Sequence, residues 1–224
     1  HADFISGHMD LAQKTGAKIY VAQSAQCTFN HVALSEGDTI ELEDMVLKVL
    51  ATPGHTPEHL SYVVIDKSRS DSPIGVFVGD TLFVGDVGRP DLFPDIAREL
   101  AGQLYHSLHD KLLQLPDYVE VYPAHGAGSL CGRAMGAKWT STIGYERKFN
   151  TTLQLKDKSA FVTSLTENMP PAPDHFSRCS DINRHGPARL DELLAVEELS
   201  ASRFKERMSD PGVLVLDTRS YHAH

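Results

Sequence analysis

Three stretches of this chain place a histidine or an aspartate directly after an apolar run that is typical of a β-strand. The residues are His55, Asp80 and His125, and each follows a short run rich in Val, Leu, Ile, Phe or Tyr. Strands of a rigid sheet can aim side chains from distant parts of the sequence at one point. Imidazole and carboxylate groups together suit zinc, or iron with open coordination positions. The pattern therefore predicts a metal site at the ends of strands.

The rest of the first 168 residues predicts further strands and the helices between them. Residues 95–115 carry leucine or isoleucine at every fourth position from Ile96 to Leu112, which gives a helix one apolar face. Shorter helices are predicted for residues 7–15, closed by Gly16, and 158–168. The predicted strands cover residues 17–23, 45–51, 60–65, 74–78 and 119–122. This order of elements favours a layered α/β sandwich with helices on both outer faces.

The sequence pattern changes after residue 150. Residues 169–173 (MPPAP) form a stiff break, and residues 190–208 predict a second clear helix. A turn at Pro211 and Gly212 then leads into residues 213–217, which read as a buried strand. These elements predict the beginning of a second α/β domain.

Size and charge limit the classes of function. A chain of 224 residues has room for one large domain, or one domain and part of another. Its net charge of −9 argues against nucleic acid or an anionic membrane surface as the main partner. The three cysteines show no ligand-pair spacing, which favours a reduced, intracellular protein. We expect a cytoplasmic bacterial protein that forms a homo-oligomer, and whose native sequence extends beyond both ends of this chain.

Five short motifs occur in a characteristic order. They are residues 1–3 (HAD), 53–57 (PGHTP), 79–81 (GDT), 88–91 (GRPD) and 122–126 (YPAHG). This series resembles the metallo-β-lactamase superfamily and, within it, the persulfide dioxygenases. Residues 126–150 are similar to the branch of that family that is fused to a rhodanese domain.

The resemblance implies a fold and a division into domains. Residues 1–150 would form a four-layer αββα sandwich, the metallo-β-lactamase-like catalytic domain. Residues 151–188 would be a C-terminal extension and linker. Residues 189–224 would begin a rhodanese-like α/β domain whose catalytic cysteine loop lies beyond His224.

The resemblance also implies a metal and its ligands. One Fe(II) per chain would be bound by His55, Asp80 and a histidine two residues before His1, and zinc can replace iron in a preparation. His1 itself would lie beside the metal, as a possible ligand. His1, Asp3 and His125 would be hydrogen-bonding neighbours or the remains of a second metal site.

Phe4 separates two kinds of enzyme that share this fold. In the dinuclear hydrolases of the superfamily, the residue after the aspartate is a histidine that binds the second metal. Phenylalanine cannot bind metal, so the resemblance implies a single ion. Two histidines and one carboxylate leave coordination positions open, the arrangement associated with non-haem Fe(II) oxygenases.

Other polar residues are weaker candidates. Arg89 is a candidate for binding the carboxylates of the substrate, although pairing with Asp86 or Asp91 explains it equally well. Tyr145 is a candidate for lining a substrate channel. We assign no role to Cys131, because no base is evident near it in the sequence. Three further histidines are not expected to be ligands: His59, His106 and His109.

These observations leave three functions to compare. The first is an iron-dependent persulfide dioxygenase that converts a thiol persulfide and dioxygen to sulfite and thiol, linked to a rhodanese. The second is a zinc-dependent thioesterase of the glyoxalase II type, against which Phe4 counts. The third is a metal-free scaffold module, against which the intact His55 and Asp80 count. The thiol carrier, glutathione, coenzyme A or another, stays open.

Overall fold

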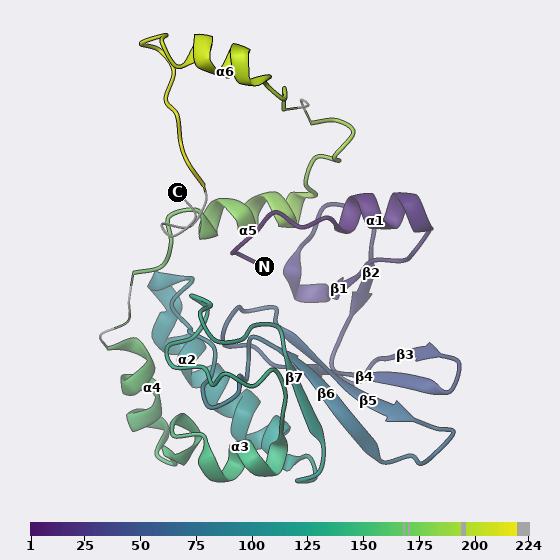
Figure 1. Cartoon of the computed structure of the whole chain (residues 1–224). Helices are drawn as coiled ribbons and strands as arrows, with labels where there is room; N and C mark the ends of the chain where they lie inside the picture. The colour runs from purple at the N-terminus through teal and green to yellow at the C-terminus, as the bar shows by residue number, and fades with distance from the viewer. Residues whose placement is uncertain (168, 170, 194–195, 219–224) are drawn as a thin grey trace. The chain divides into compact units, whose positions relative to one another are not determined.

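The computed structural model describes residues 1–167, 169, 171–193 and 196–218. The chain divides into two compact units, which comprise residues 1–187 and 188–224. Among the described residues, the first unit contains all the strands and the helices α1 to α5 (Figure 1). The predicted ligands all lie in this first unit.

The first unit is built around a six-stranded mixed sheet. Its strands follow one another in sequence order: β3 (Thr39–Leu42), β4 (Met45–Ala51), β5 (Leu60–Asp66), β6 (Pro73–Gly79), β7 (Glu120–Pro123) and β8 (Ser141–Thr142). Neighbouring strands are antiparallel except β6 and β7, which are parallel. A separate parallel pair joins β1 (Tyr20–Ala22) to β2 (Val32–Leu34).

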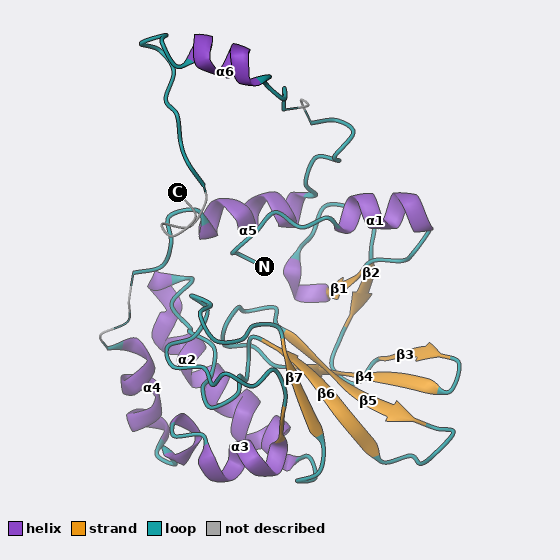
Figure 2. Ribbon diagram, viewed as in Figure 1, coloured by secondary structure: helices purple, strands orange, loops and turns teal. Residues whose placement is uncertain are grey.

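Helices cover one face of the sheet, in agreement with the predicted layered α/β class. Three of them lie together on one side of the unit (Figure 2): α2 (Ala97–His106), α3 (Ile143–Phe149) and α4 (Lys158–Thr166). The β1–β2 pair, α1 (His8–Thr15) and α5 (Phe176–His185) lie together above the sheet in the same view. The main core forms where α2 to α4 pack on the sheet. It includes Val63, Val76, Val78 and Val121 from the strands, and Leu104, Leu108, Ile143 and Phe161 from the helical side.

The helix predicted for residues 95–115 is correct in position but not regular. After α2 the chain continues as a π-helical turn (Ser107–Lys111) and a 3₁₀ turn (Leu112–Gln114). A spacing of four residues exceeds the 3.6 residues of an α-helical turn, so an apolar stripe would rotate away from the core. The wider π turn keeps the stripe facing inward. Accordingly, Leu100, Leu104, Leu108 and Leu112 are all buried.

Strand direction brings the predicted ligands to one edge of the sheet. β4 and β6 run the same way because each pairs with β5 in antiparallel fashion, and β7 runs parallel to β6. His55, Asp80 and His125 follow the carboxyl ends of β4, β6 and β7 respectively. The three residues therefore lie at the same edge, as the sequence predicted.

The predictions near the start of the chain hold in outline. The helix over residues 7–15 is α1, and Gly16 after it adopts the left-handed conformation with φ 71°. The strand predicted over residues 17–23 is limited to β1, because only the backbone from Tyr20 to Ala22 pairs with β2. The remaining predicted strands are present.

In the second unit the predicted elements are largely wrong. Of the helix predicted over residues 190–208, only α6 (Ala201–Arg207) is helical among the described residues, and positions 194–195 lie outside them. Short helices are marginal without packing, and Val196 is 92% exposed. Residues 213–217 form no strand in the described structure, since no other described strand pairs with them. The assignment to a rhodanese-like domain stays a prediction.

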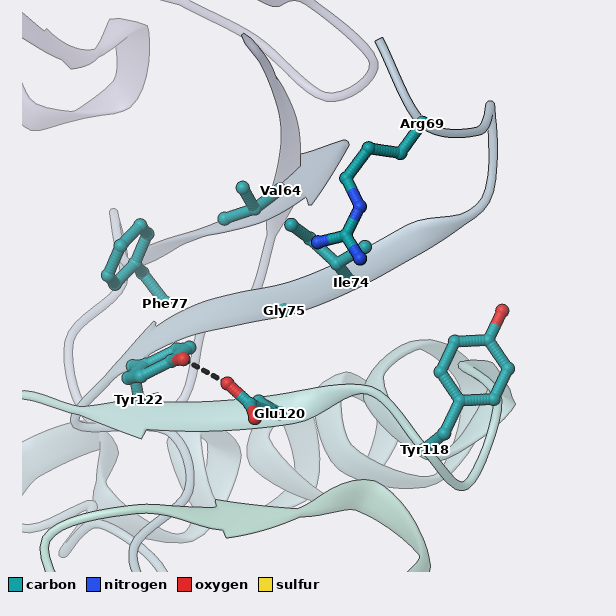
Figure 3. A pocket seen from close by; sticks show the side chains of 8 residues that line it. All are labelled: Val64, Arg69, Ile74, Gly75, Phe77, Tyr118, Glu120 and Tyr122. Atoms are coloured by element: carbon teal, nitrogen blue, oxygen red, sulfur yellow. Dashed lines mark hydrogen bonds between the residues drawn. The ribbon is translucent and has the colours of Figure 1, made fainter. Parts of the chain in front are cut away.

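A surface groove opens on strands β5 to β7, away from the predicted ligands. Figure 3 shows the residues that line it: Val64, Arg69, Ile74, Gly75, Phe77, Tyr118, Glu120 and Tyr122. The Tyr122 hydroxyl donates a hydrogen bond to the Glu120 carboxylate. None of the candidate ligands is among the lining residues, so the groove is separate from the candidate site. In the part of the chain that the structure describes, no helix is long and apolar enough to cross a bilayer.

Candidate metal centre

His55 lies in the loop between β4 and β5, with its side chain fully buried. Its Nδ1 donates a hydrogen bond of 2.8 Å to the backbone oxygen of Arg89. Because Nδ1 makes that bond, Nε2 is the ring nitrogen that is turned toward Asp80. Gly54 keeps the loop close to α2, since a Cβ there would lie 2.4 Å from the Leu104 Cβ. The ring is thus fixed in direction.

Asp80 follows β6 and is 1% exposed. One carboxylate oxygen, Oδ2, faces Nε2 of His55 at 3.2 Å and also contacts Nε2 of His1. The other oxygen, Oδ1, lies 2.7 Å from Nδ1 of His125. Burial raises the pKa of this carboxyl, but hydrogen bonds with the three imidazoles outweigh burial and hold the pKa of Asp80 well below its usual range. The group is therefore a charged, oriented oxygen donor.

The spacing of the donor atoms fits a single ion. Ligand atoms of His1, His55, Asp80 and Cys131 all lie within 4.8 Å of one another. Two ligands about 2.1 Å from one ion, at angles of about 90–110°, are about 3.0–3.4 Å apart. His55 Nε2 lies 3.2 Å from both Asp80 Oδ2 and His1 Nε2. Imidazole, carboxylate and thiol donors suit zinc or iron better than magnesium or calcium, so the residues fit a divalent transition metal.

His1 and Asp3 form the open side of this cluster. Their side chains are 23% and 24% exposed, and Nδ1 of His1 is hydrogen-bonded to the Asp3 carboxylate. Burial disfavours a charged His1 ring, but hydrogen bonds with Asp80 and Cys131 outweigh burial and raise the pKa of His1 to about 11. The cluster therefore stabilises positive charge at the point where a cation would bind.

Asn183 in α5 holds the segment that carries His1. Its side chain is 7% exposed, and its Nδ2 donates bonds of 2.8 Å to the backbone oxygens of His1 and Phe4. Its Oδ1 accepts a bond of 2.8 Å from the amide of Ser6. This region was predicted to be an extension and linker, without any predicted contact to the start of the chain. One asparagine within a polar helix carries no sequence signal for it.

His125 links two carboxylates. Besides its contact with Asp80, its Nε2 lies 2.8 Å from Oδ2 of Asp3. The hydrogen bond with Asp80 raises the pKa of His125 to about 9. His125 also belongs, with His1, Asp3 and Cys131, to a group of side chains that could hold a metal. The two roles predicted for it, hydrogen-bonding neighbour and remnant of a second metal site, both stay predictions.

Cys131 belongs to the cluster, contrary to the sequence analysis. Its thiol is 1% exposed, and Sγ lies 3.9 Å from Nε2 of His1. Burial raises the pKa of the thiol, but hydrogen bonds from His1 and His55 outweigh burial and lower it to about 7. The expectation that no base lies near Cys131 was wrong, because the loop after β7 folds back onto the cluster. A hydrogen bond of 3.1 Å from the Arg89 amide to the Cys131 backbone oxygen holds the loop there.

Arg89 has the structural pairing that the sequence left open as an alternative. Its side chain is 3% exposed and donates two bonds of 2.7 Å to the Asp91 carboxylate. Its Nη1 also donates to the backbone oxygen of Leu130 at 3.2 Å. The residue thereby ties together the loops that carry His55 and Cys131. A direct role in binding substrate stays a prediction.

The described residues contain two overlapping groups of possible metal ligands: His1, His55, Asp80 and Cys131, and His1, Asp3, His125 and Cys131. The remaining candidates lie outside both groups. Tyr145, in α3, is 43% exposed, and the Lys138 ammonium lies 5.2 Å from its ring centroid. Its predicted substrate-binding role is not tested by this contact. Among the described residues, neither ligand group includes His59, His106 or His109. Burial lowers the pKa of His59 to about 3, so its ring is uncharged.

Comparison with known proteins identifies the family. The model of the Metallo-beta-lactamase superfamily matches residues 1–125. The chain belongs to this superfamily. Its members bind divalent metals, and among the described residues His1, His55, Asp80 and Cys131 form one of two groups that could do so.

Individual members of the superfamily are similar to this chain at modest identity. The chain is 32% identical over 179 residues to the mitochondrial persulfide dioxygenase ETHE1 of Bos taurus, which covers 79% of this chain. It is 34% identical over 183 residues to a hydroxyacylglutathione hydrolase of Pseudomonas entomophila, which covers 82%. The chain spans 62% and 66% of the lengths of these two relatives.

A solved structure supports the fold. The metallo-beta-lactamase of Staphylococcus aureus subsp. aureus COL superposes with a TM-score of 0.77 at 37% sequence identity. The match covers 84% of this chain and 56% of that one. The metallo-β-lactamase fold class predicted from the sequence is therefore confirmed.

Proposed function

We propose that this protein is an iron-dependent persulfide dioxygenase. It would oxidise a low-molecular-weight thiol persulfide, such as glutathione persulfide, according to RSSH + O₂ + H₂O → RSH + SO₃²⁻ + 2 H⁺. Both oxygen atoms of dioxygen and one from water enter the sulfite, and the terminal sulfur of the persulfide is oxidised. The similarity to a persulfide dioxygenase of Bos taurus supports this choice of reaction.

The observation that carries the proposal is Phe4, a residue that cannot bind metal, next to the donor group of His1, His55, Asp80 and Cys131. Phe4 occupies the position where dinuclear hydrolases of this fold have a histidine ligand, and its ring stacks on His1 with centroids 6.4 Å apart. The other donor expected at a second metal, His125, is shared between the carboxylates of Asp3 and Asp80. A single ion with open positions favours oxygenation over two-metal hydrolysis.

The residues of this chain would hold and shield the metal. His55 and Asp80 would be ligands, with the third histidine expected two residues before His1 and with His1 beside the metal. When bound, Fe(II) supplies redox chemistry and open coordination positions for the oxidation. The two buried ligands keep water from one side of the metal, because each is at most 1% exposed.

The second candidate is a zinc-dependent thioesterase of the glyoxalase II type. The observation in its favour is the 34% identity to the hydroxyacylglutathione hydrolase of Pseudomonas entomophila. Asp3 and His125, which could bind a second metal, are also present, with Oδ2 of Asp3 2.8 Å from Nε2 of His125. Phe4 is the feature that weighs against this candidate. We further propose that the reaction is coupled to a rhodanese sulfurtransferase, on the strength of the sequence resemblance of residues 189–224.

One experiment separates the two candidates. The protein is loaded anaerobically with Fe(II), or in parallel with zinc, and mixed with glutathione persulfide or S-lactoylglutathione. The Fe(II) form is expected to consume dioxygen and release sulfite from the persulfide, and to leave the thioester intact. The zinc form is expected to be inactive, since zinc has no accessible redox change.

The His55→Ala protein serves as the control for adventitious iron. Thioester hydrolysis by the zinc form, with no oxygen uptake on the persulfide by the Fe(II) form, would overturn the proposal. That result would establish the thioesterase instead.

A further inference from the structure

The backbone amide of Asp80 is satisfied by a side chain. β6 ends at Gly79, whose φ of 50° turns the chain out of the strand. The amide of the next residue, Asp80, donates a hydrogen bond of 3.0 Å to Nε2 of His59. The imidazole therefore holds Asp80 at the point where the chain leaves the sheet.

The partners of His59 determine its tautomer. A backbone amide can only donate, so Nε2 is the acceptor and the ring proton is on Nδ1. Nδ1 lies 2.9 Å from Oγ1 of Thr52 and 3.0 Å from Oγ1 of Thr81. The Thr81 hydroxyl donates to the backbone oxygen of Thr52 at 3.2 Å, which leaves its oxygen free to accept from Nδ1. Both ring nitrogens are thus used, and the ring cannot flip without breaking these bonds.

The surroundings of His59 are themselves rigid. The Thr52 amide donates to the backbone oxygen of His59 at 2.9 Å, which continues the β4–β5 pairing by one step. The Thr52 hydroxyl also bonds to the Ser61 hydroxyl at 2.8 Å. At position 79 a Cβ would lie 2.4 Å from Nε2 of His59, so glycine is required for the close approach. The His59 side chain therefore connects the end of β4, the start of β5 and the end of β6.

We infer that His59 is a positioning residue, which fixes the direction of the Asp80 carboxylate toward His55. The inference rests on the proposed role of Asp80 as a metal ligand. His59 would not touch the metal; it would act by restricting the backbone from which Asp80 projects. Partners that orient a ligand typically change metal affinity by about 10–100-fold.

Two substitutions at this position separate positioning from simple packing. His59→Asn keeps an N–H group near Nδ1 for the two threonines, but has no acceptor at the place of Nε2. His59→Gln carries a side-chain oxygen that can reach that place and accept from the Asp80 amide. Both are measured for Co(II) affinity by competition with a chelator, for the Co(II) visible absorption spectrum, and for the melting temperature of the metal-free protein.

The expected result is a difference in metal binding at similar stability. His59→Asn is expected to weaken Co(II) affinity by about 10–100-fold and to alter the absorption spectrum. His59→Gln is expected to restore most of the affinity and the original spectrum. Thr81→Val, which removes one hydroxyl acceptor but leaves the ring in place, is expected to weaken affinity in the same direction but less.

Unchanged Co(II) affinity in His59→Asn would overturn the inference. An equal loss of affinity in the Asn and Gln proteins, in step with an equal loss of melting temperature, would also overturn it and assign His59 to packing. If His59→Asn does not fold, Thr81→Val decides, and unchanged affinity there contradicts the inference.

An Asp80→Ala protein distinguishes this failure from failure of the metal site itself. If Asp80→Ala still binds Co(II) normally, the proposed ligand role of Asp80 is wrong and the inference falls with it. If Asp80→Ala loses Co(II) while His59→Asn binds it normally, only the inference about His59 is wrong.

Discussion

The two halves of the candidate metal centre are built in different ways. The inner half, His55 and Asp80, is at most 1% exposed, and it is fixed by hydrogen bonds that His55 donates to the Arg89 backbone oxygen and that the Asp80 amide donates to His59. The outer half, His1 and Asp3, has side chains 23% and 24% exposed, and its backbone is held mainly through Asn183 of α5. A sheet edge thus pre-organises one pair of donors, whereas the other depends on a helix from the extension. We expect the inner half to determine metal affinity and the outer half to tune it.

The largest effect is expected from removing an inner ligand. In His55→Ala or Asp80→Ala, only weakly organised donors remain, so metal affinity should fall by more than about 100-fold, beyond the range of orienting partners. Persulfide-dependent oxygen uptake should be lost with it. Elemental analysis after dialysis, together with an oxygen electrode, measures both quantities.

His106→Ala is the matched control, because His106 is a half-exposed histidine on α2 that pairs with Asp110. It should retain full metal content and activity. Normal metal content in both His55→Ala and Asp80→Ala would place the metal elsewhere and remove the distinction between inner and outer halves.

A smaller effect is expected when the outer half is loosened. Asn183→Ala removes three hydrogen bonds to the backbone of residues 1–6, and each contributes about 0.5–1.5 kcal/mol. Because only the outer donors are freed, we expect metal affinity to fall by about tenfold. Asn30→Ala, at an exposed asparagine, is the control in the same chelator competition. A loss as large as that of Asp80→Ala would show that the outer half is as important as the inner.

Replacing Phe4 is expected to have a still smaller effect than Asn183→Ala, and to add metal binding instead of weakening it. Phe4→His adds an imidazole beside Asp3 and His125, which completes a donor set for a second ion. Zinc content should rise from about one toward two ions per chain, with the second ion bound more weakly. Phe149→His, at a similarly exposed phenylalanine, should leave the zinc content unchanged. No increase in Phe4→His would mean that Phe4 does not decide between one metal and two.

The smallest effect is expected at Tyr145, outside both halves. If this residue lines the substrate channel, Tyr145→Ala should raise the KM for glutathione persulfide by about two- to fivefold and leave kcat and metal content unchanged. Steady-state oxygen uptake at varied persulfide concentration measures both constants. An unchanged KM would remove Tyr145 from the substrate site.

The contrast between the halves also explains what the sequence could predict. The inner half follows from local patterns, because an apolar strand that ends in His55 or Asp80 is visible in the sequence. Strand direction then brings these ends together without further information. The fold class and the position of α2 were predicted for the same reason, since apolar periodicity specifies which faces are buried.

Contacts made through loops and backbone atoms were not predictable. Cys131 reaches His1 only because the loop after β7 returns to the cluster, and the Arg89 residue orients His55 through a backbone oxygen, which any residue type would supply. Asn183 joins the site across more than 170 residues of sequence. None of these contacts leaves a periodic pattern.

The errors in the second unit have a different physical cause. Residues 190–208 and 213–217 have helical and strand patterns, but Val196 and Leu214 are 92% and 89% exposed. An amphipathic pattern stabilises an element only when its apolar face is covered. Within the described residues of this unit, those faces are uncovered, and the predicted elements form only as α6.

The most direct test of the account is to locate the metal. A crystal of the Fe(II)-loaded protein, measured above and below the iron absorption edge, gives an anomalous difference map of iron alone. The account predicts one peak, about 2.0–2.2 Å from both Nε2 of His55 and a carboxylate oxygen of Asp80. A peak between Asp3 and His125 with none at His55 would contradict it, as would two peaks of equal height.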